Sequence, residues 1–330
     1  MSTTSEIDSL SPYGSHVPYV RTFGWGMLAV LVAFMINNVL SVGYDFPPIR
    51  ELMNGNALSW VPLAVYLAGI GCAWWYVAGS PDRALRYDAR KISAFNAYLI
   101  RACFFSVLFV GIADAAIAFL RVEGLLPLLF SENLSKELIR ARFIGPWIHF
   151  PLIGLSFVIA YFSRSLGFIW LALMIVVAEL LIVISRFVFS YEQALMGDLV
   201  RYWYAALFLF SSAYTLMDEG HVRVDVFYAG FQQRTKGKIN AIGSIMLGMT
   251  TCWVVIIIGF GSKQSIINSP VTNFEVSQTG TAGMFIKYQM AAFLAIFAIT
   301  MLIQFVSYLF EAVADKRDEP GRRVVAEITH

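Results

Sequence analysis

Long apolar runs recur along the whole chain and are separated by short polar segments. Eight runs have the length that an α-helix needs to cross about 30 Å of hydrocarbon. They are Phe23–Gly43, Ala57–Gly79, Tyr98–Leu120, Phe143–Phe162, Leu166–Phe189, Leu199–Met217, Ala241–Ser262 and Met284–Phe310. None shows the strict alternation of a barrel strand, and a helix satisfies its own backbone hydrogen bonds in lipid. The pattern predicts an all-α integral membrane protein of about eight transmembrane helices.

The composition supports this class and excludes others. Hydrophobic residues make up 58% of the 330 positions and charged residues only 14%, whereas about a quarter of a soluble domain is charged. So few charges would not cover a soluble surface. The net charge of +2 and the lack of a long basic cluster predict no nucleic-acid partner.

The distribution of basic residues predicts the orientation of the helices. If the N-terminus is cytoplasmic, most Lys and Arg residues outside the runs fall in inner segments, among them Arg83, Arg86, Arg90 and Lys91. This excess favours a cytoplasmic location of both termini. The outer segment Arg121–Arg142 carries acidic and basic residues at helical spacing, which indicates either a short surface helix or a solvated connector.

The chain lacks the motifs of common enzymes. It contains no phosphate-binding GxxxxGK[ST] loop, no HExxH and no GxSxG, so it is predicted not to be an enzyme. No metal or cofactor is expected. A haem held between helices would need two histidines at matched depth, and only His149 is near a span. A membrane anchor of a redox complex is therefore a weak alternative.

Two acidic residues are deep inside predicted spans. Asp114 is in the third run and Glu179 is in the middle of the fifth. Ionisable residues at such depth are functional candidates, and these two would couple ions in a stand-alone secondary carrier. The competing interpretation is a hydrogen bond between helices, or a neutral carboxylic acid that faces the bundle or a partner subunit.

The most distinctive motif runs from Ser185 to Tyr228. It contains SRFVF, then an Arg and a Trp at the start of the next helix, and GHVRVD after that helix. Its main positions are Arg186, Arg201, Trp203, Gly220, His221, Arg223 and Asp225, with Lys287 and Gln304 further on. The pattern resembles the small membrane (Q, or DctQ-type) subunit of tripartite ATP-independent periplasmic (TRAP) transporters. It is most similar to the branch for mannitol, chloroaromatic or 2-oxo acid compounds.

The resemblance implies a scaffold rather than a catalyst. It covers about Leu166 to Glu311 and divides the chain into an N-terminal extension with about four transmembrane helices (1–165), a four-helix DctQ-like domain (166–311) and a cytoplasmic tail (312–330). It also implies a bacterial inner-membrane location and sodium-coupled import with two partners, a large DctM-type membrane subunit and a periplasmic solute-binding protein. One departure is the outer turn, where scattered Glu192 and Asp198 replace an acidic cluster of the family.

Overall fold

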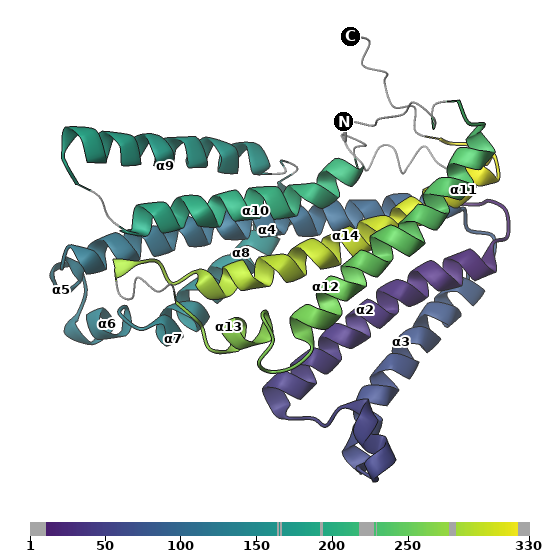
Figure 1. The fold of residues 1–330 in the computed structure, drawn as a ribbon, viewed down its shortest axis with the longest axis horizontal. Coiled ribbons are helices and arrows are strands. Elements are labelled where there is room, and N and C mark those ends of the chain that lie inside the picture. The colour runs from purple at the N-terminus through teal and green to yellow at the C-terminus, as the bar shows by residue number, and fades with distance from the viewer. Residues whose placement is uncertain are drawn as a thin grey trace. The chain divides into compact units, whose positions relative to one another are not determined.

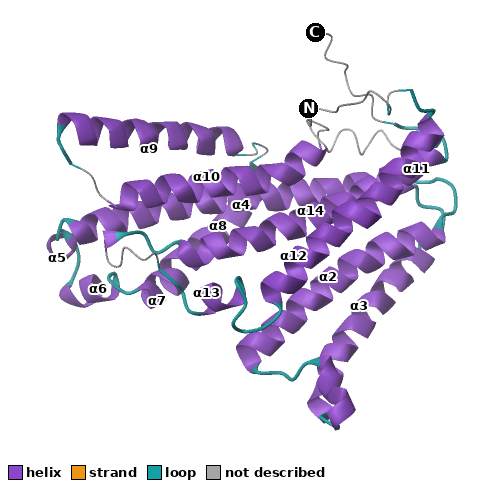
Figure 2. Ribbon diagram, viewed as in Figure 1, coloured by secondary structure: helices purple, strands orange, loops and turns teal. Residues whose placement is uncertain are grey.

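The computed structural model describes residues 11–163, 165, 167–191, 194–217, 228, 230–276 and 282–322. In these residues the secondary structure is helical, apart from one isolated antiparallel bridge between Tyr13 and Arg83 (Figure 2). The predicted all-α class is therefore confirmed.

Eight helices form most of the structure (Figure 1). They are α2 (Pro18–Tyr44), α3 (Trp60–Ala78), α4 (Leu85–Val122), α8 (Phe150–Phe162), α9 (Phe168–Val188), α10 (Ala194–Met217), α12 (Thr250–Phe260) and α14 (Lys287–Lys316). The other described α-helices are α5 (Leu126–Leu129), α6 (Glu132–Glu137), α7 (Ala141–Ile144), α11 (Gln233–Gly243) and α13 (Asn268–Thr272). Two 3₁₀ segments, η1 (Ile49–Asn54) and η2 (Ala57–Ser59), precede α3, and two π-helical segments, η3 (Gly145–His149) and η4 (Ser244–Met249), precede α8 and α12.

Seven helical stretches in the described residues are long and apolar enough to cross a membrane. They are Pro18–Tyr44, Ala57–Ala78, Leu85–Val122, Ala141–Phe162, Phe168–Val188, Gln233–Phe260 and Lys287–Lys316. The protein is thus a multi-pass membrane protein. The remaining predicted span coincides with α10, a helix of 24 residues that does not reach the same apolar standard because it carries Arg201 and several hydroxyl side chains.

Helix α4 begins well before the apolar run that predicted it. Its first turns contain Arg86 and Arg90, which hydropathy assigns to a polar connector. In the structure Arg86 bonds to Glu311 at 2.6 Å and to Asp315 at 2.8 Å, and Arg90 bonds to Glu311 at 2.9 Å. Because α14 supplies these carboxylates, the charged turns remain helical and are packed in the protein.

Contacts between Cα atoms divide the chain into two compact units. One comprises residues 1–96, 215–263 and 301–330, and the other comprises residues 97–214 and 264–300. Three of the four boundaries fall inside α4, α10 and α14, so each of these helices contributes to both units. The division that the sequence predicts, at residues 165 and 311, remains a prediction.

In the first unit, α2 and α3 form a hairpin (Figure 1). A Cβ placed on Gly69 of α3 would lie 3.3 Å from the backbone oxygen of Ala29 in α2. The missing side chain allows the two backbones to approach closely, as small residues do in membranes. Arg21 of α2 is fully buried and pairs with Asp88 of α4 at 2.8 Å, and this ion pair joins the hairpin to α4.

The second unit contains the segment 121–142. Its helix α6 has an exposed pair between Lys136 and Glu132 at 2.6 Å, as the charge pattern predicts for a surface helix. The buried side chains of Leu126, Leu138 and Ile144 pack with Phe285. The connector between α4 and α7 is therefore anchored by its own apolar cluster.

Candidate functional site

Two carboxylates hold the segment that leads into α14, in the second unit. Asp114 of α4 accepts a hydrogen bond from the backbone N–H of Phe285 at 2.6 Å, and Asp198 of α10 accepts one from Met284 at 3.1 Å. The side chain of Asp114 is fully buried. A charged acceptor strengthens such hydrogen bonds, so these two acids fix the entry of α14.

A basic residue of α4 also binds this segment. Arg121 donates to the backbone carbonyl of Gly283, and its guanidinium carbon is 4.0 Å from the centroid of the Phe285 ring. This is cation–π geometry. The chain entering α14 is therefore bound through its backbone and through a side chain.

Asp114 also begins a buried polar chain that joins four helical elements. Its second oxygen is 3.4 Å from Nε2 of His149 in η3, and Nδ1 of His149 is 2.9 Å from the hydroxyl of Tyr288 in α14. That hydroxyl accepts a hydrogen bond from Gln289 at 2.9 Å, and Tyr202 of α10 donates to the carbonyl oxygen of Gln289. Buried networks of this kind specify one arrangement of their helices, because each unmade bond is costly.

His149 is the histidine near a span that the sequence analysis considered as a haem ligand. Both ring nitrogens face protein side chains, one toward Tyr288 and the other toward Asp114. The ring also lies nearly parallel to that of Tyr288, with centroids 5.9 Å apart. Nδ1 of the histidine is thus within hydrogen-bond distance of Tyr288, whereas Nε2 lies beside Asp114 without a hydrogen bond to any described residue.

Lys287 is the first residue of α14. Its ammonium group is 2.5 Å from a carboxylate oxygen of Glu275, whose backbone carbonyl accepts the N–H of Tyr288 at 3.1 Å. A cation at a helix N-terminus opposes the helix dipole, and Glu275 offsets that cost. Lys287 therefore helps to hold residue Glu275 against the first turn of α14.

Trp203 is a packing residue between α10 and α4. It is 3% exposed, and its indole N–H donates to the carbonyl of Val107 at 3.1 Å. A Cβ placed on Gly111 would lie 2.3 Å from that indole nitrogen, so only glycine fits there. Arg201, by contrast, is 78% exposed, and its guanidinium is 4.0 Å from Asp198.

Gln304 is at the centre of a polar contact between α14 and α4 in the first unit. It donates to Ser93 at 3.0 Å and accepts from Asn96 at 3.2 Å. Ser307, one turn further along α14, donates to the carbonyl of Ala89 at 2.8 Å. Small hydroxyl and amide side chains are common between transmembrane helices, and these residues join α4 to α14.

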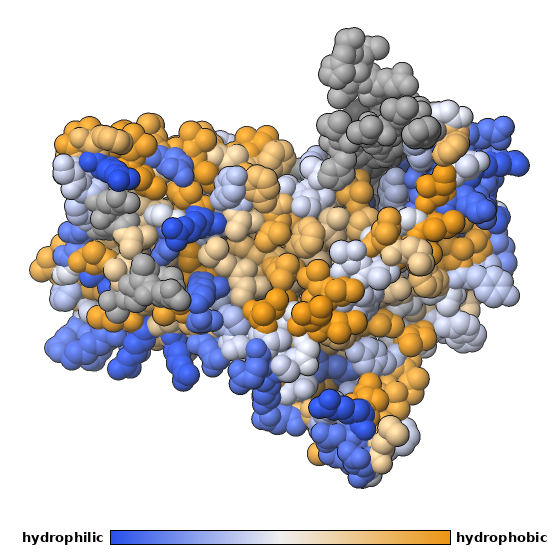
Figure 3. All heavy atoms as spheres, in the orientation of Figure 1, coloured by the Kyte–Doolittle hydropathy of each residue, from blue (hydrophilic) through white to orange (hydrophobic). Residues whose placement is uncertain are grey.

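Glu179 is in a different environment from Asp114. It is exposed at the middle of α9, a helix in which only Leu171 and Ala178 are buried. Most of the visible surface of α9 is hydrophobic, with small hydrophilic patches in it (Figure 3). No hydrogen bond or ion pair of Glu179 occurs within the described residues. Arg186 follows seven residues later, on the same helical face, and is also exposed.

The rest of the predicted motif cannot be placed. Gly220, His221, Arg223 and Asp225 lie outside the described residues. Of the sequence-predicted site residues, Asp114, Trp203 and Lys287 belong to the second unit with Glu179, Arg186 and Arg201, whereas Gln304 belongs to the first.

The structure identifies partners of Asp114 that the sequence analysis did not. Tyr202, Tyr288 and Gln289 are in or beside the apolar runs and complete the chain from Asp114 through His149. The available signal was the presence of several polar side chains near the ends of apolar runs. The pairing itself joins positions far apart in the sequence and has no local signature.

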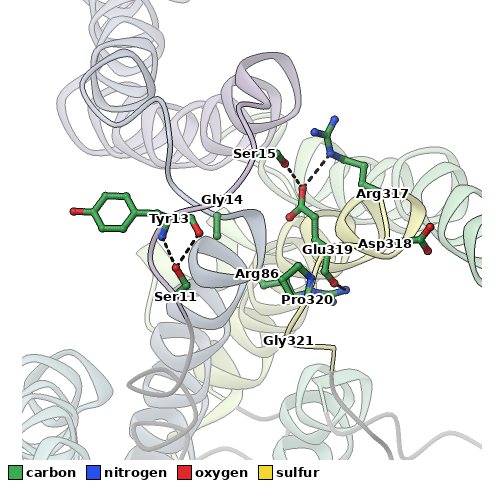
Figure 4. Close-up of a pocket in the computed structure, with 11 residues that line it drawn as sticks. Ser11, Tyr13, Gly14, Ser15, Arg86, Arg317, Asp318, Glu319, Pro320 and Gly321 are labelled. Carbon is green, nitrogen blue, oxygen red and sulfur yellow. Dashed lines mark hydrogen bonds and ion pairs between the residues drawn. The ribbon is translucent and has the colours of Figure 1, made fainter.

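A cavity of about 610 Å³ in the first unit is lined by residues from both ends of the described chain (Figure 4). The Glu319 carboxylate accepts hydrogen bonds from Ser15 at 2.5 Å and from Arg317 at 3.0 Å. Arg86 donates to the Glu319 backbone carbonyl at 3.0 Å. These contacts join the residues before α2 to those after α14.

Comparison with known families bears on the second half of the chain. Residues 173–315 match the family model of the DctQ component of tripartite ATP-independent periplasmic transporters. This segment is DctQ-like. The matched family is a transporter component and not an enzyme family, which agrees with the prediction that the chain is not an enzyme. No curated protein and no solved structure matches the chain.

The match includes α9 from residue 173 onward, α10, α11, η4, α12, α13 and nearly all of α14. Asp114 and His149 precede it, yet both contact residues inside it, Phe285 and Tyr288. The DctQ-like segment thus shares a buried polar network with helices that come before it in the sequence.

Proposed function

We propose that this chain is the small membrane subunit of a TRAP transporter in a bacterial inner membrane. The observation that carries the proposal is the DctQ match over residues 173–315, supported by the multi-pass helical structure. In this role the chain works with a large DctM-type membrane subunit, which moves the solute with sodium ions, and with a periplasmic solute-binding protein. Both termini are in the cytoplasm.

The chain acts as a fixed scaffold for the large subunit. Several of its buried polar groups join helices: Asp114 binds the entry of α14, and Gln304 joins α14 to α4. Such contacts hold a frame in one arrangement, since a partly broken buried network is costly. The solute specificity of the complex, for mannitol, a chloroaromatic or a 2-oxo acid, is then set by the other subunits.

Helix α9 supplies the contact with the large subunit. A carboxyl group at the middle of a span is costly when it faces lipid, and Glu179 has no partner within the described residues. A cation or hydrogen-bond donor on the large subunit would remove this cost. Arg186 is on the same helical face, so the two charged residues define one side of α9 as the docking side.

The test is co-expression of this chain with a DctM-type large membrane subunit from the same organism, followed by affinity purification and a solute-uptake assay in cells. Deletion of the chain is expected to abolish uptake. Replacing Glu179 with Leu is expected to lower the recovery of the large subunit severalfold. Leu181→Ala changes the opposite face of α9 and is expected to leave the recovery unchanged.

Two results would contradict the proposal. If uptake persists after deletion of the chain, it is not a required transporter subunit. If the purified chain alone carries solute into liposomes, it is a stand-alone carrier, and Asp114 and Glu179 then become its candidate ion-coupling residues. An unchanged recovery with Glu179→Leu would remove α9 as the docking helix without affecting the family assignment.

A further inference from the structure

An apolar groove of about 700 Å³ runs along the membrane-spanning part of the first unit. Its walls are α2 and α3, and residues of α4 and α14 contribute to its floor, including Ile92 and Ile303. The volume is in the range of small-molecule sites. The groove is formed mainly by helices that precede the DctQ-like segment, and the scaffold function proposed above does not require it.

The lining residues of α2 and α3 form two helical stripes. On α2 the stripe extends from Trp25 to Ile36, and on α3 it extends from Val65 to Tyr76. Each stripe is about 16 Å long at the rise of an α-helix, roughly half of the 30 Å hydrocarbon core. The groove therefore has the depth of one leaflet of the bilayer.

One end of the groove has the chemistry of the headgroup region. Trp25 and Tyr76 are in edge-to-face contact there, with centroids 4.9 Å apart, and aromatic residues of this type concentrate at membrane interfaces. Lys91 also lines this end, and its ammonium is 4.7 Å from the centroid of the Tyr87 ring. The opposite end, near Ile36 and Val65, is apolar.

The positive charge at this end is not neutralised within the described residues. Arg86 and Arg90 are engaged by Glu311 and Asp315. Within the part of the chain that the structure describes, Lys91 forms no ion pair and its ammonium lies over the aromatic ring of Tyr87. Arg83 donates to the Tyr76 hydroxyl at 2.5 Å and forms no ion pair with any described residue. Two cations beside an apolar groove complement a phosphate attached to an acyl chain.

We infer that this groove is a binding site for an anionic phospholipid. One acyl chain lies in the groove along α2 and α3, and the phosphate lies against Lys91 and Arg83. The membrane supplies the ligand, and the charge of the groove end selects anionic over zwitterionic headgroups. A basic residue near an anionic lipid surface is worth about fivefold in binding, which sets the expected selectivity from Lys91.

The experiment uses the full chain in nanodiscs of phosphatidylethanolamine and phosphatidylglycerol. A trace of either lipid carries a photoreactive diazirine in its acyl chain, and adducts are mapped by mass spectrometry. The expected result is an excess of phosphatidylglycerol adducts on the groove side of α2 and α3. Lys91→Gln is expected to lower this excess about fivefold, whereas Lys238→Gln, a change of an exposed lysine on α11, leaves it unchanged.

A second pair of variants tests the acyl-chain site. Ala68 lines the groove, and Ile70 is on the opposite side of α3 and does not line it. Ala68→Trp is expected to reduce the groove adducts severalfold, and Ile70→Trp to leave them unchanged. Both positions are exposed, so neither substitution should disturb packing, which size-exclusion chromatography would verify.

Three outcomes would overturn the inference. Adducts spread evenly over all lipid-facing helices would indicate bulk lipid only. Equal labelling by the two lipids, unchanged by Lys91→Gln, would remove the headgroup site. Cys72 lines the groove and is exposed, so a Cys72–Cys72 disulfide formed under mild oxidation would show that a second copy of the chain occupies the groove instead.

Discussion

The bond between Asp114 and the backbone of Phe285 gives the sharpest stability prediction. The two groups are buried, and the oxygen and nitrogen are 2.6 Å apart. Asp114→Ala removes the acceptor and leaves a buried N–H unpaired, which costs about 1–3 kcal/mol. It also removes the negative charge beside His149 and near Arg121, and breaking a buried charged contact brings the total to about 3–5 kcal/mol.

Asp114→Asn separates these two contributions. The asparagine side chain keeps an oxygen that can accept from Phe285, but it carries no charge. Its cost is therefore expected to be smaller than that of the alanine variant by about 1–3 kcal/mol, the value of the retained acceptor. At about 2 °C per kcal/mol for a chain of this size, Asp114→Ala is expected to lower the apparent melting temperature by about 6–10 °C.

Thiol reactivity provides the assay. Cys252 is buried and Cys103 is half-buried, whereas Cys72 is exposed, so in a Cys72→Ser background a thiol-reactive dye reports the unfolding that exposes the other two thiols. The variants are compared in one detergent at one heating rate, because irreversible unfolding makes the apparent midpoint depend on the scan. Equal midpoints for the Asn and Ala variants would refute the hydrogen-bond reasoning. Wild-type midpoints for both would show that Asp114 does not anchor α14.

Two further predictions concern glycine packing and a surface tyrosine. Gly111→Ala is expected to destabilise the protein by about 1–3 kcal/mol because the new methyl group collides with Trp203. Gly154→Ala, where the added atom meets nothing within 4 Å, is expected to be neutral or stabilising in the same melting assay. The hydrogen bond from Tyr191 to Glu123 raises the pKa of Tyr191 to about 12, so this contact is complete below pH 10 and is lost as the pH rises through about 12. The difference between phenolate absorbance titrations of the wild type and Tyr191→Phe measures that pKa, which Glu123→Gln should return toward 10.

Apolar run length alone locates the long apolar helices of this protein. Each of the eight runs contains a helix, because lipid leaves the backbone no other way to satisfy its polar groups. The start of α4 could not be found in this way. Arg86 and Arg90 make its first turns look like a connector, and the carboxylates that pair with them, Glu311 and Asp315, are on α14. Hydropathy is averaged over neighbouring residues, so it contains no information about ion-pair partners that are far away in the sequence.

For the site residues, too, the sequence predicts which side chains are unusual but not which contacts they make. The sequence identifies Asp114 and Glu179 as unusual because each is an acid inside an apolar run, but it does not indicate which of the two is buried. The structure separates them: Asp114 is buried and bound to Phe285, whereas Glu179 is exposed on α9. Burial depends on which face of a helix meets the rest of the protein, and one acid in an apolar run does not reveal that face.

Asp114 and His149 contact residues at the start of α14, and this matters for the design of truncated or chimeric proteins. A fragment that begins near residue 166 would keep Phe285 and Tyr288 but lose both of their upstream partners. The Phe285 amide would lose its acceptor, and the Tyr288 hydroxyl would lose its hydrogen bond with His149. Grafting only the recognisable half onto another permease is therefore expected to yield an aggregating polypeptide, and chimeras should exchange the whole chain.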